Sequence, residues 1–346
     1  MHARPPSANP TGGSSGARAC ARRRAVFRCD GGERFGAGHV ARCLPLAAAL
    51  TRLGWQTSFA GAYDGLAEWL VERSGAMTAA PDPIAPCGVD PDGCELAIVD
   101  SYTIATAAIC ELAETLPVLT LAEASRCSHL GILLDYHLDR ETACEPRLLA
   151  GPAYAPLDPA FAAAGRPGTD VHKLLVTVGG SGAAAALQGE IAARAAAAFP
   201  NAEVLLAGPG TGSFTGACEC KLETFTASNG RIHRLPHPSS LLEVASEIDL
   251  AVTAAGLTSY ELACAGVPQL AIAVADNQRR VVDGLRRRDL AVCLDLTRGD
   301  SLSDLPSALR RISEPALRRD LSERGMRVFD GRGAERAATA LTELLG

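Results

Sequence analysis

One histidine, His39, stands where a glycine-rich loop runs into a helix. The loop follows the apolar segment Ala25-Val26-Phe27, carries glycines at 31, 32, 36 and 38, and gives way to apolar residues at helical spacing as far as Leu53. A strand, a glycine loop and a helix N-terminus let backbone N–H groups approach an anion or a polar ligand. The positive end of the helix dipole disfavours an imidazolium in the first turn. We therefore expect a neutral His39 that can accept a proton.

The same stretch also has a plain structural interpretation. Doubly wound domains use glycine for tight packing between strand and helix, and a lone histidine is more often structural than catalytic. A dinucleotide site is not favoured, because the glycine spacing is not G-x-G-x-x-G and no later acidic residue requires one. The lysine of a P-loop is missing as well.

Four further corners of the same kind follow along the chain, each between an apolar strand and a helix. They carry Asp100–Tyr102, Gly179–Ser181, Gly256–Glu261 and Asp276–Gln278. Apolar strands that alternate with helices predict a parallel sheet covered on both faces. Ligands of such sheets bind beyond the carboxyl ends of the strands. The five corners are therefore candidates for a binding site.

The alternation is interrupted by proline and glycine between Gly151 and Gly168, which predicts a domain boundary. We expect a disordered tail over 1–24, a Rossmann-like domain over 25–155, a linker over 156–170 and a second Rossmann-like domain over 171–346. The last helix is a candidate to pack back on the first domain. The predicted fold class is α/β, with two parallel-sheet domains facing a cleft. Strands are expected near 25–27, 56–60, 96–100, 118–121, 132–134, 174–178, 203–206, 232–235, 250–254 and 268–274. Helices are expected near 38–53, 66–74, 105–115, 183–199, 239–245, 257–266 and 278–288, and over 305–345 with a break at 331–333.

Composition narrows the function classes. A net charge of -6 argues against a general nucleic-acid binder, whose surface should be basic. No apolar run approaches the ~18 residues of a membrane span. The 12 cysteines are scattered without a C-x-x-C pair, so neither zinc nor a disulfide framework is indicated. Several, among them Cys43, Cys110 and Cys264, fit predicted helices as small apolar residues, which favours a reducing cytoplasm.

Several segments together resemble a known family, the PseG-like UDP-sugar hydrolases of pseudaminic acid biosynthesis. The resemblance covers about residues 26–294, and its second half is also similar to MurG, the UDP-GlcNAc transferase of peptidoglycan synthesis. The matching segments are Arg28-x-Asp30, Phe35-Gly36-x-Gly38-His39-Val40-x-Arg42-Cys43-Leu44, Val99-Asp100-Ser101-Tyr102, Gly151-Pro152-x-Tyr154-Ala155-x-Leu157, Val178-Gly179-Gly180-Ser181, Ala254-Ala255-Gly256-x-Thr258-x-x-Glu261, Gly266-Val267-Pro268 and Asp276-Asn277-Gln278.

This resemblance implies a two-domain GT-B fold whose second domain binds UDP. It implies cleavage by water of the anomeric C–O bond of a UDP-linked 2,4-diacetamido-2,4,6-trideoxy sugar, with inversion and with no metal or other cofactor. The family's active-site histidine, tyrosine and asparagine match His39, Tyr102 and Asn277.

The residue types suit these roles. A neutral His39 can take a proton from water as general base. The hydroxyl of Tyr102 can orient the water or a sugar acetamido group, although an aromatic cleft wall is an equal alternative. Asn277 offers a donor and an acceptor to the sugar, and with Gln278 it could also cap a helix.

Ten further residues are candidates for substrate binding. A helix that begins after Gly256 and carries Thr258 suits a diphosphate. Glu261 is placed to accept hydrogen bonds from ribose hydroxyls; the alternative is a surface helix acid. Backbone at Gly180 and Ser181 could approach the phosphates. The full set is Asp30, Gly36, Gly38, Arg42, Gly180, Ser181, Gly256, Thr258, Glu261 and Gln278.

Two positions depart from the family pattern. Leu121-Ala122-Glu123-Ala124 stands where an Asp-Asp pair is expected, and Asp158 where a basic residue is expected. The first departure leaves the identity of the sugar open. The leading hypothesis is a cytoplasmic UDP-sugar hydrolase, a monomer or weak dimer, without nucleic-acid or membrane partners. A GT-B glycosyltransferase, with His39 deprotonating an acceptor hydroxyl or amine, is the alternative. A non-catalytic nucleotide-sugar sensor is the third.

Overall fold

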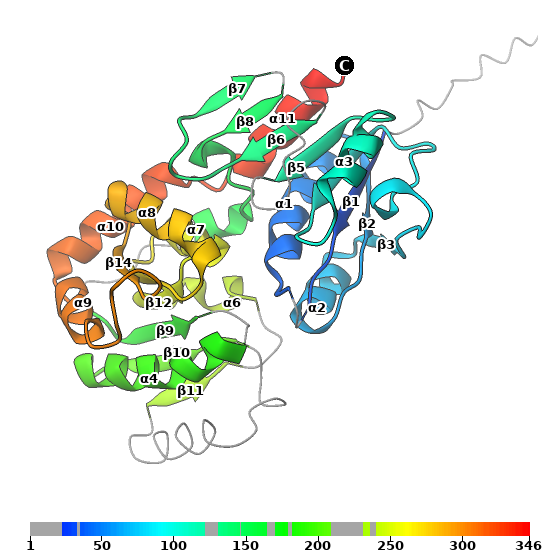
Figure 1. The fold of residues 1–346 in the computed structure, drawn as a ribbon. Helices are drawn as coiled ribbons and strands as arrows, with labels where there is room; N and C mark the ends of the chain where they lie inside the picture. The colour runs from blue at the N-terminus through cyan, green and yellow to red at the C-terminus, as the bar shows by residue number, and fades with distance from the viewer. Residues whose placement is uncertain are drawn as a thin grey trace, which may run out of the picture.

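The computed structural model describes residues 23–32, 35–121, 131–145, 147–164, 170–178, 182–208, 231–235 and 240–346, with the backbone alone for 182–186. Figure 1 shows two α/β lobes, each built around one sheet. The expected tail over 1–24 lies almost wholly outside the described residues. Gly180, Ser181 and the segment 122–124 lie outside them too.

The first sheet has eight strands in the order β3-β2-β1-β4-β5-β6-β8-β7. Its central strands are continuous apolar runs because helices cover both faces, and β4 is buried at every residue. All neighbours are parallel except β7 and β8, which form an antiparallel edge. The strands are β1 (Arg24–Cys29), β2 (Gln56–Ala60), β3 (Met77–Ala79), β4 (Leu96–Asp100), β5 (Val118–Leu121), β6 (Ile132–Asp135), β7 (Ala143–Glu145) and β8 (Leu148–Ala150).

Among the described residues, three helices and three short 3-10 turns belong to this part of the chain. The longest helix, α1, buries the apolar face that the spacing predicts, including Val40, Leu46 and Leu50. The 3-10 turns η2 and η3 lie in the proline-rich segment expected to separate the domains. The helices and turns are α1 (Gly38–Arg52), α2 (Gly65–Ser74), α3 (Thr106–Ala113), η1 (Pro86–Gly88), η2 (Pro152–Tyr154) and η3 (Pro159–Ala163).

The second sheet has six parallel strands in the order β11-β10-β9-β12-β13-β14. The strands are β9 (Lys173–Thr177), β10 (Glu203–Leu206), β11 (Ile232–Arg234), β12 (Leu250–Ala254), β13 (Gln269–Ala273) and β14 (Val292–Asp295). The helices and turn that follow them are α4 (Gly182–Ala198), α6 (Leu242–Ala245), α7 (Leu257–Cys264), η4 (Asp276–Gln278), α8 (Arg279–Arg287), α9 (Leu305–Ile312), α10 (Pro315–Val328) and α11 (Gly333–Leu344).

Both sheets share one feature that places ligands. If the strands of each lobe are numbered from 1 in chain order, strands β1 to β6 of the first sheet and the strands of the second sheet both lie side by side in the order 3-2-1-4-5-6. In this order the chain reverses direction across the sheet between strands 1 and 4, and the crevice beyond their carboxyl ends is the usual ligand site. The switch points therefore lie at β1/β4 in the first lobe and at β9/β12 in the second.

The last helix returns to the first lobe, as Figure 1 shows in red. α11 packs on α1, and the Trp55 indole Nε1–H donates to the Thr342 hydroxyl at 3.0 Å. The first residue of α11, Gly333, lies against the backbone of Ala155: an added Cβ there would be 2.0 Å from the Ala155 carbonyl oxygen. The side chain of Arg23 donates to the carbonyl of Gly346, so the first and last described residues meet in the first lobe.

The two lobes share one apolar core. A single cluster of buried side chains runs from Phe27 and Leu50 in the first lobe to Leu262 in the second. Tyr136 and Tyr260 meet in it edge to face, with ring centroids 6.1 Å apart. The lobes are therefore packed against each other through apolar contact as well as being joined by the chain.

Two expectations need correction. The strands β3, β7, β8 and β14 were not expected, since the first three have only three residues each and carry no apolar alternation. Cys110 on α3 is disulfide-bonded, so it is not simply a small apolar helix residue, although seven other cysteines of the described residues are free. No helix within the described residues is long and apolar enough to cross a membrane.

Candidate active site

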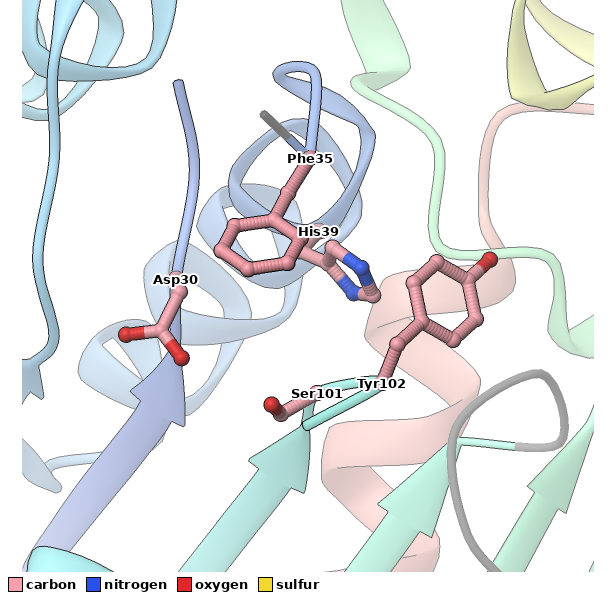
Figure 2. A pocket seen from close by; sticks show the side chains of 5 residues that line it. All are labelled: Asp30, Phe35, His39, Ser101 and Tyr102. Atoms are coloured by element: carbon pink, nitrogen blue, oxygen red, sulfur yellow. The ribbon is translucent and has the colours of Figure 1, made fainter. Parts of the chain in front are cut away.

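The first candidate site lies at the switch point of the first sheet. β1 and β4 are neighbours in register, with Cys29 opposite Asp100, so Asp30 and Ser101 follow at adjacent strand ends. Figure 2 shows both side chains at the tips of these strands, with Tyr102 beside them and His39 above. The pocket at this place is lined by Asp30, Phe35, His39, Ser101 and Tyr102.

The loop before α1 closes by hydrogen bonds between glycines. The Gly36 N–H donates to the Gly32 carbonyl at 2.7 Å, and the Gly32 N–H donates back to Gly36 at 3.1 Å. Gly36 has φ of +71°, a conformation in which a side chain would be strained. The tight turn brings Phe35 to the pocket wall and lets α1 begin at Gly38, which places His39 in its first turn.

The His39 ring is held from beneath by an acid and an arginine. Its Nδ1 lies 2.9 Å from Asp100 Oδ1 and 2.9 Å from Arg42 Nη2. Arg42 in turn donates to both carboxylate oxygens of Asp100, from Nε at 2.5 Å and from Nη2 at 2.8 Å. The side chains of His39, Arg42 and Asp100 are 3%, 4% and 0% exposed. All three side chains are therefore buried and in contact with one another.

The charge of Asp100 bears on how the protons of the His39 ring are arranged. Burial by itself raises the pKa of Asp100, but the Arg42 charge and the His39 hydrogen bond outweigh it and hold the pKa below its usual range. An ionised carboxylate only accepts, so the proton of Nδ1 faces Asp100, and a neutral ring held in this way has its lone pair at Nε2. The adjacent Cys43 thiol stays neutral, because its hydrogen bond with Cys29 and its burial raise its pKa well above the usual range.

The imidazole is far less accessible than the mouth of an open groove would make it. Only 3% of the side chain is exposed, whereas 47% of Tyr102 is exposed. The two rings meet edge to face, with centroids 4.5 Å apart, and Figure 2 shows the imidazole between Phe35 and Tyr102. The His39 side chain therefore lies in a narrow, closely packed pocket.

Asp30 supplies a fixed carboxylate to this pocket. Its Oδ1 accepts from Arg28 Nη1 at 2.7 Å and from the Ala62 N–H at 3.1 Å. The side chain is 13% exposed and lies on the pocket wall. A ligand here meets a negatively charged acceptor, which suits a hydroxyl or amide N–H group.

The second lobe contributes the corner after β12. α7 begins at Leu257 directly after Gly256, and a Cβ at Gly256 would meet no atom within 4 Å, so the backbone there is open to a ligand. Burial raises the pKa of the partly buried Glu261 to about 7, although a hydrogen bond with Thr258 opposes the shift. Glu261 therefore changes charge near neutral pH.

The corner after β13 carries the amides. Asn277 is exposed in η4. The Gln278 side chain instead turns back, and its Oε1 accepts from the Val274 N–H at 2.8 Å. Neither makes a capping hydrogen bond to α8, so the helix-cap interpretation does not apply. Gln278 stabilises the turn from which Asn277 projects.

The structure brings together some of the expected residues and separates others. Asp30, His39 and Tyr102 share one pocket, with Gly36 and Gly38 shaping its loop. Asn277, Gln278, Gly256, Thr258 and Glu261 lie at the edge of the other sheet and do not line that pocket. Gly180 and Ser181 are outside the described residues. Arg42 was expected to bind substrate, but it lies beneath the ring with its guanidinium engaged by Asp100.

Three residues of the site had been given no role of their own, although Asp100 and Ser101 lie in one of the expected corners and Phe35 lies in a family-like segment. Asp100 orients His39, and Phe35 and Ser101 line the pocket. An acid that ends a fully apolar strand, as Asp100 does, is the signal that points to such a role. Within the described residues no group of three or more His, Cys, Asp or Glu side chains could hold a metal ion.

Comparison with known proteins establishes the fold. Neither a family model nor a curated protein sequence matches the chain. Among solved structures, MurG of Acinetobacter baumannii aligns with a TM-score of 0.62 and 16% identity over 93% of this chain and 99% of that one. The glycosyltransferase of kitacinnamycin gives 0.62 and 16% over 94% and 99%. UDP-GlcNAc 2-epimerase from Neisseria meningitidis, solved with UDP-GlcNAc, gives 0.58 and 9% over 93% and 100%. The chain therefore has the two-domain, doubly Rossmann-like architecture of GT-B proteins.

Proposed function

We propose that this chain is a UDP-sugar hydrolase, which cleaves the anomeric C–O bond of an amino-deoxy sugar and releases UDP and the free sugar. The observation that carries the proposal is the imidazole of His39, held through Nδ1 by Asp100 at 2.9 Å and lining a pocket at the switch point. Structures of similar fold include one solved with UDP-GlcNAc, which supports a nucleotide-sugar ligand. The matches to the PseG-like pattern support the hydrolase and the amino-deoxy sugar.

The chemistry needs one base and a good leaving group. Water attacks the anomeric carbon from the face opposite UDP, the C–O bond to the diphosphate breaks, and the water proton passes to His39 Nε2. Asp100 stabilises the imidazolium that forms, because its carboxylate stays ionised and accepts the hydrogen bond from Nδ1–H throughout. Attack from the opposite face inverts the anomeric centre. UDP leaves as an anion, so a separate strong acid is not required.

Water is assigned as the nucleophile because the His39 side chain, 3% exposed and flanked by Phe35 and Tyr102, leaves little room for a bulky acceptor. The ring of Tyr102 lies beside the imidazole, and 47% of this residue is exposed to solvent. We assign it to the sugar side of the pocket, and Asp30 to a hydroxyl or amide N–H of the sugar. Arg42 positions Asp100.

The nucleotide belongs to the second lobe in this proposal. The open backbone at Gly256 and the start of α7 suit the diphosphate. Glu261 on the same helix accepts from the ribose hydroxyls when ionised. Asn277 completes the sugar site from the corner after β13.

A glycosyltransferase is the second candidate, favoured by the fold. MurG and the kitacinnamycin enzyme share it, and His39 could equally deprotonate an acceptor hydroxyl or amine. Fold alone does not separate the two reactions.

The experiment is release of UDP from a panel of UDP-linked amino sugars, followed by chromatography with and without candidate acceptors. Acceptor-independent release, with the inverted anomer seen first by proton NMR, supports the hydrolase. Release that requires an acceptor contradicts it and establishes the transferase. His39→Gln should lose turnover by ~10²- to 10⁴-fold while UDP binding by calorimetry persists. The matched control is His233→Gln, an exposed histidine of β11 paired with Glu203 at 3.6 Å.

A further inference from the structure

A cluster of charges joins the two lobes beside the candidate site. Arg280 of α8 donates from Nη2 to Asp135 Oδ2 at 2.9 Å and to Asp139 Oδ1 at 2.8 Å. Its Nε also lies 3.1 and 3.0 Å from the two Asp139 oxygens. Asp135 is the last residue of β6 in the first sheet, and Asp139 lies in the segment that follows it. We refer to Asp135, Asp139 and Arg280 as the clamp.

The buried half of the clamp is built to hold a fixed carboxylate. Asp135 has 3% of its side chain exposed and also accepts from His137 Nδ1 at 3.0 Å and Arg140 Nε at 2.8 Å. Burial alone would raise the pKa of Asp135, but the hydrogen bonds from His137, Arg280 and Arg140 hold it well below the usual range. Removing the Arg280 guanidinium therefore leaves a buried charge short of a partner.

The rest of α8 is seated on the same segment. At the far end, Arg288 donates to the carbonyls of Leu138 at 2.7 Å and Arg140 at 3.1 Å. In the middle, Gly284 faces Leu138 so closely that an added Cβ would lie 2.7 Å from the Leu138 Cβ. The helix therefore contacts the first lobe along its length rather than at one exposed salt bridge.

This seating determines where one candidate site residue lies. Asn277 and Gln278 are the last two residues of η4, and α8 begins directly after them at Arg279. Asp135 ends β6, two strands from β4 along the same carboxyl edge that carries the His39 pocket. We propose that the clamp is a positioning device, which sets the distance of Asn277 from the first lobe so that one sugar can contact both Asn277 and the His39 pocket. The inference rests on the proposed function for its catalytic consequence.

Turnover tests whether the clamp acts through Asn277. Arg280→Gln should lower kcat/KM by ~10- to 100-fold, mainly through KM for the UDP-sugar, while the affinity for UDP alone stays within ~2-fold. In the Asn277→Ala background the same change should have no further effect, because the group that it positions is gone. The matched control is Arg286→Gln on α8, whose arginine contacts Asp283 and Asp300 within its own lobe. Independent, multiplying losses from Arg280→Gln and Asn277→Ala would overturn the proposal.

Amide hydrogen exchange tests the seating without relying on activity. Arg280→Gln should raise exchange at least ~10-fold in peptides that cover 276–288 and 135–140, and Arg286→Gln should not. Gly284→Ala is a second variant: alanine favours an isolated helix, so faster exchange would report a disturbed seat rather than a weaker helix. Unchanged exchange in both variants overturns the clamp even in an active enzyme. If the wild-type chain releases no UDP from any sugar, the proposed function fails while exchange still decides the seating.

Discussion

Replacing Asp100 by asparagine is the sharpest test of how His39 is prepared for catalysis. The carboxylate accepts two hydrogen bonds from Arg42, at 2.5 and 2.8 Å, and one from His39 Nδ1. An asparagine of the same size has one accepting oxygen and an N–H₂ group that can only donate. With the amide oxygen in the place of Oδ1, the N–H₂ group faces Arg42 Nε as donor against donor; with the amide reversed, it faces His39 Nδ1 and Arg42 Nη2. In either orientation the negative charge that would stabilise a His39 imidazolium is lost.

The structure gives the size of both effects. Arg42 is 4% exposed, so it stays buried with an incomplete partner, and breaking such a pair costs about 3 to 5 kcal/mol of the unfolding free energy. Against an ordinary stability of about 5 to 15 kcal/mol, this loss leaves the variant folded near room temperature except at the low end of that range. General base catalysis contributes ~10²- to 10⁴-fold, and we expect kcat to fall within that range.

The assay measures UDP release at 15 °C, where the variant is folded, beside urea unfolding of the same preparations. The matched control is Asp249→Asn: this partly buried acid accepts from the N–H groups of His172 and Lys173, each at 2.9 Å, and lies outside both candidate sites. It should lose stability and keep its turnover. The double variant of Asp100→Asn with His39→Gln should be no slower than His39→Gln alone. A folded Asp100→Asn variant with turnover within ~3-fold of wild type would refute the reasoning.

Three other outcomes are expected. UDP affinity should rise by up to ~10-fold between pH 6 and pH 8, because Glu261, with its pKa raised to about 7, ionises in that range and can then accept from the ribose hydroxyls. Calorimetry should find a flatter dependence of UDP affinity on pH in Glu261→Gln, which lacks this carboxyl. Unfolding stability from the low pKa of Asp100 should be complete above about pH 3.8 and lost as pH falls below it, so the drop in urea midpoint from pH 5 to pH 3 should be smaller in Asp100→Asn. Leu341→Ala, at a fully buried position of α11, should cost about 2 to 5 kcal/mol, and Trp55 fluorescence should report it as unfolding of the first lobe; an unchanged midpoint would mean that α11 does not stabilise that lobe.

Much of the fold could be predicted from local pattern. The run Leu96–Asp100 is entirely apolar until its last residue, and it forms a strand with those bounds, because a strand buried on both faces needs no polar side. The three-residue strands β3 and β7 could not be predicted, since their pairing depends on a neighbour brought in by the tertiary fold.

The site was predicted in part for the same physical reason. A glycine loop before a helix pointed to His39 and to the region of its pocket, because residues adjacent in the sequence determine that local geometry. The role of Arg42 was not predicted, because its partner Asp100 is distant in sequence and only the β1–β4 register places the acid under the helix. Burial of the ring also depends on Phe35 and Tyr102 from separate loops.

The position of α11 has a consequence for synthesis of the protein. α11, the 12-residue helix that packs on α1, follows the second lobe in the sequence. On the ribosome, α1 therefore emerges long before α11, and the part of its apolar side that α11 covers remains uncovered meanwhile. The nascent chain is expected to complete its C-terminal lobe before its N-terminal one, reversing the usual order, and to need chaperone protection during that interval.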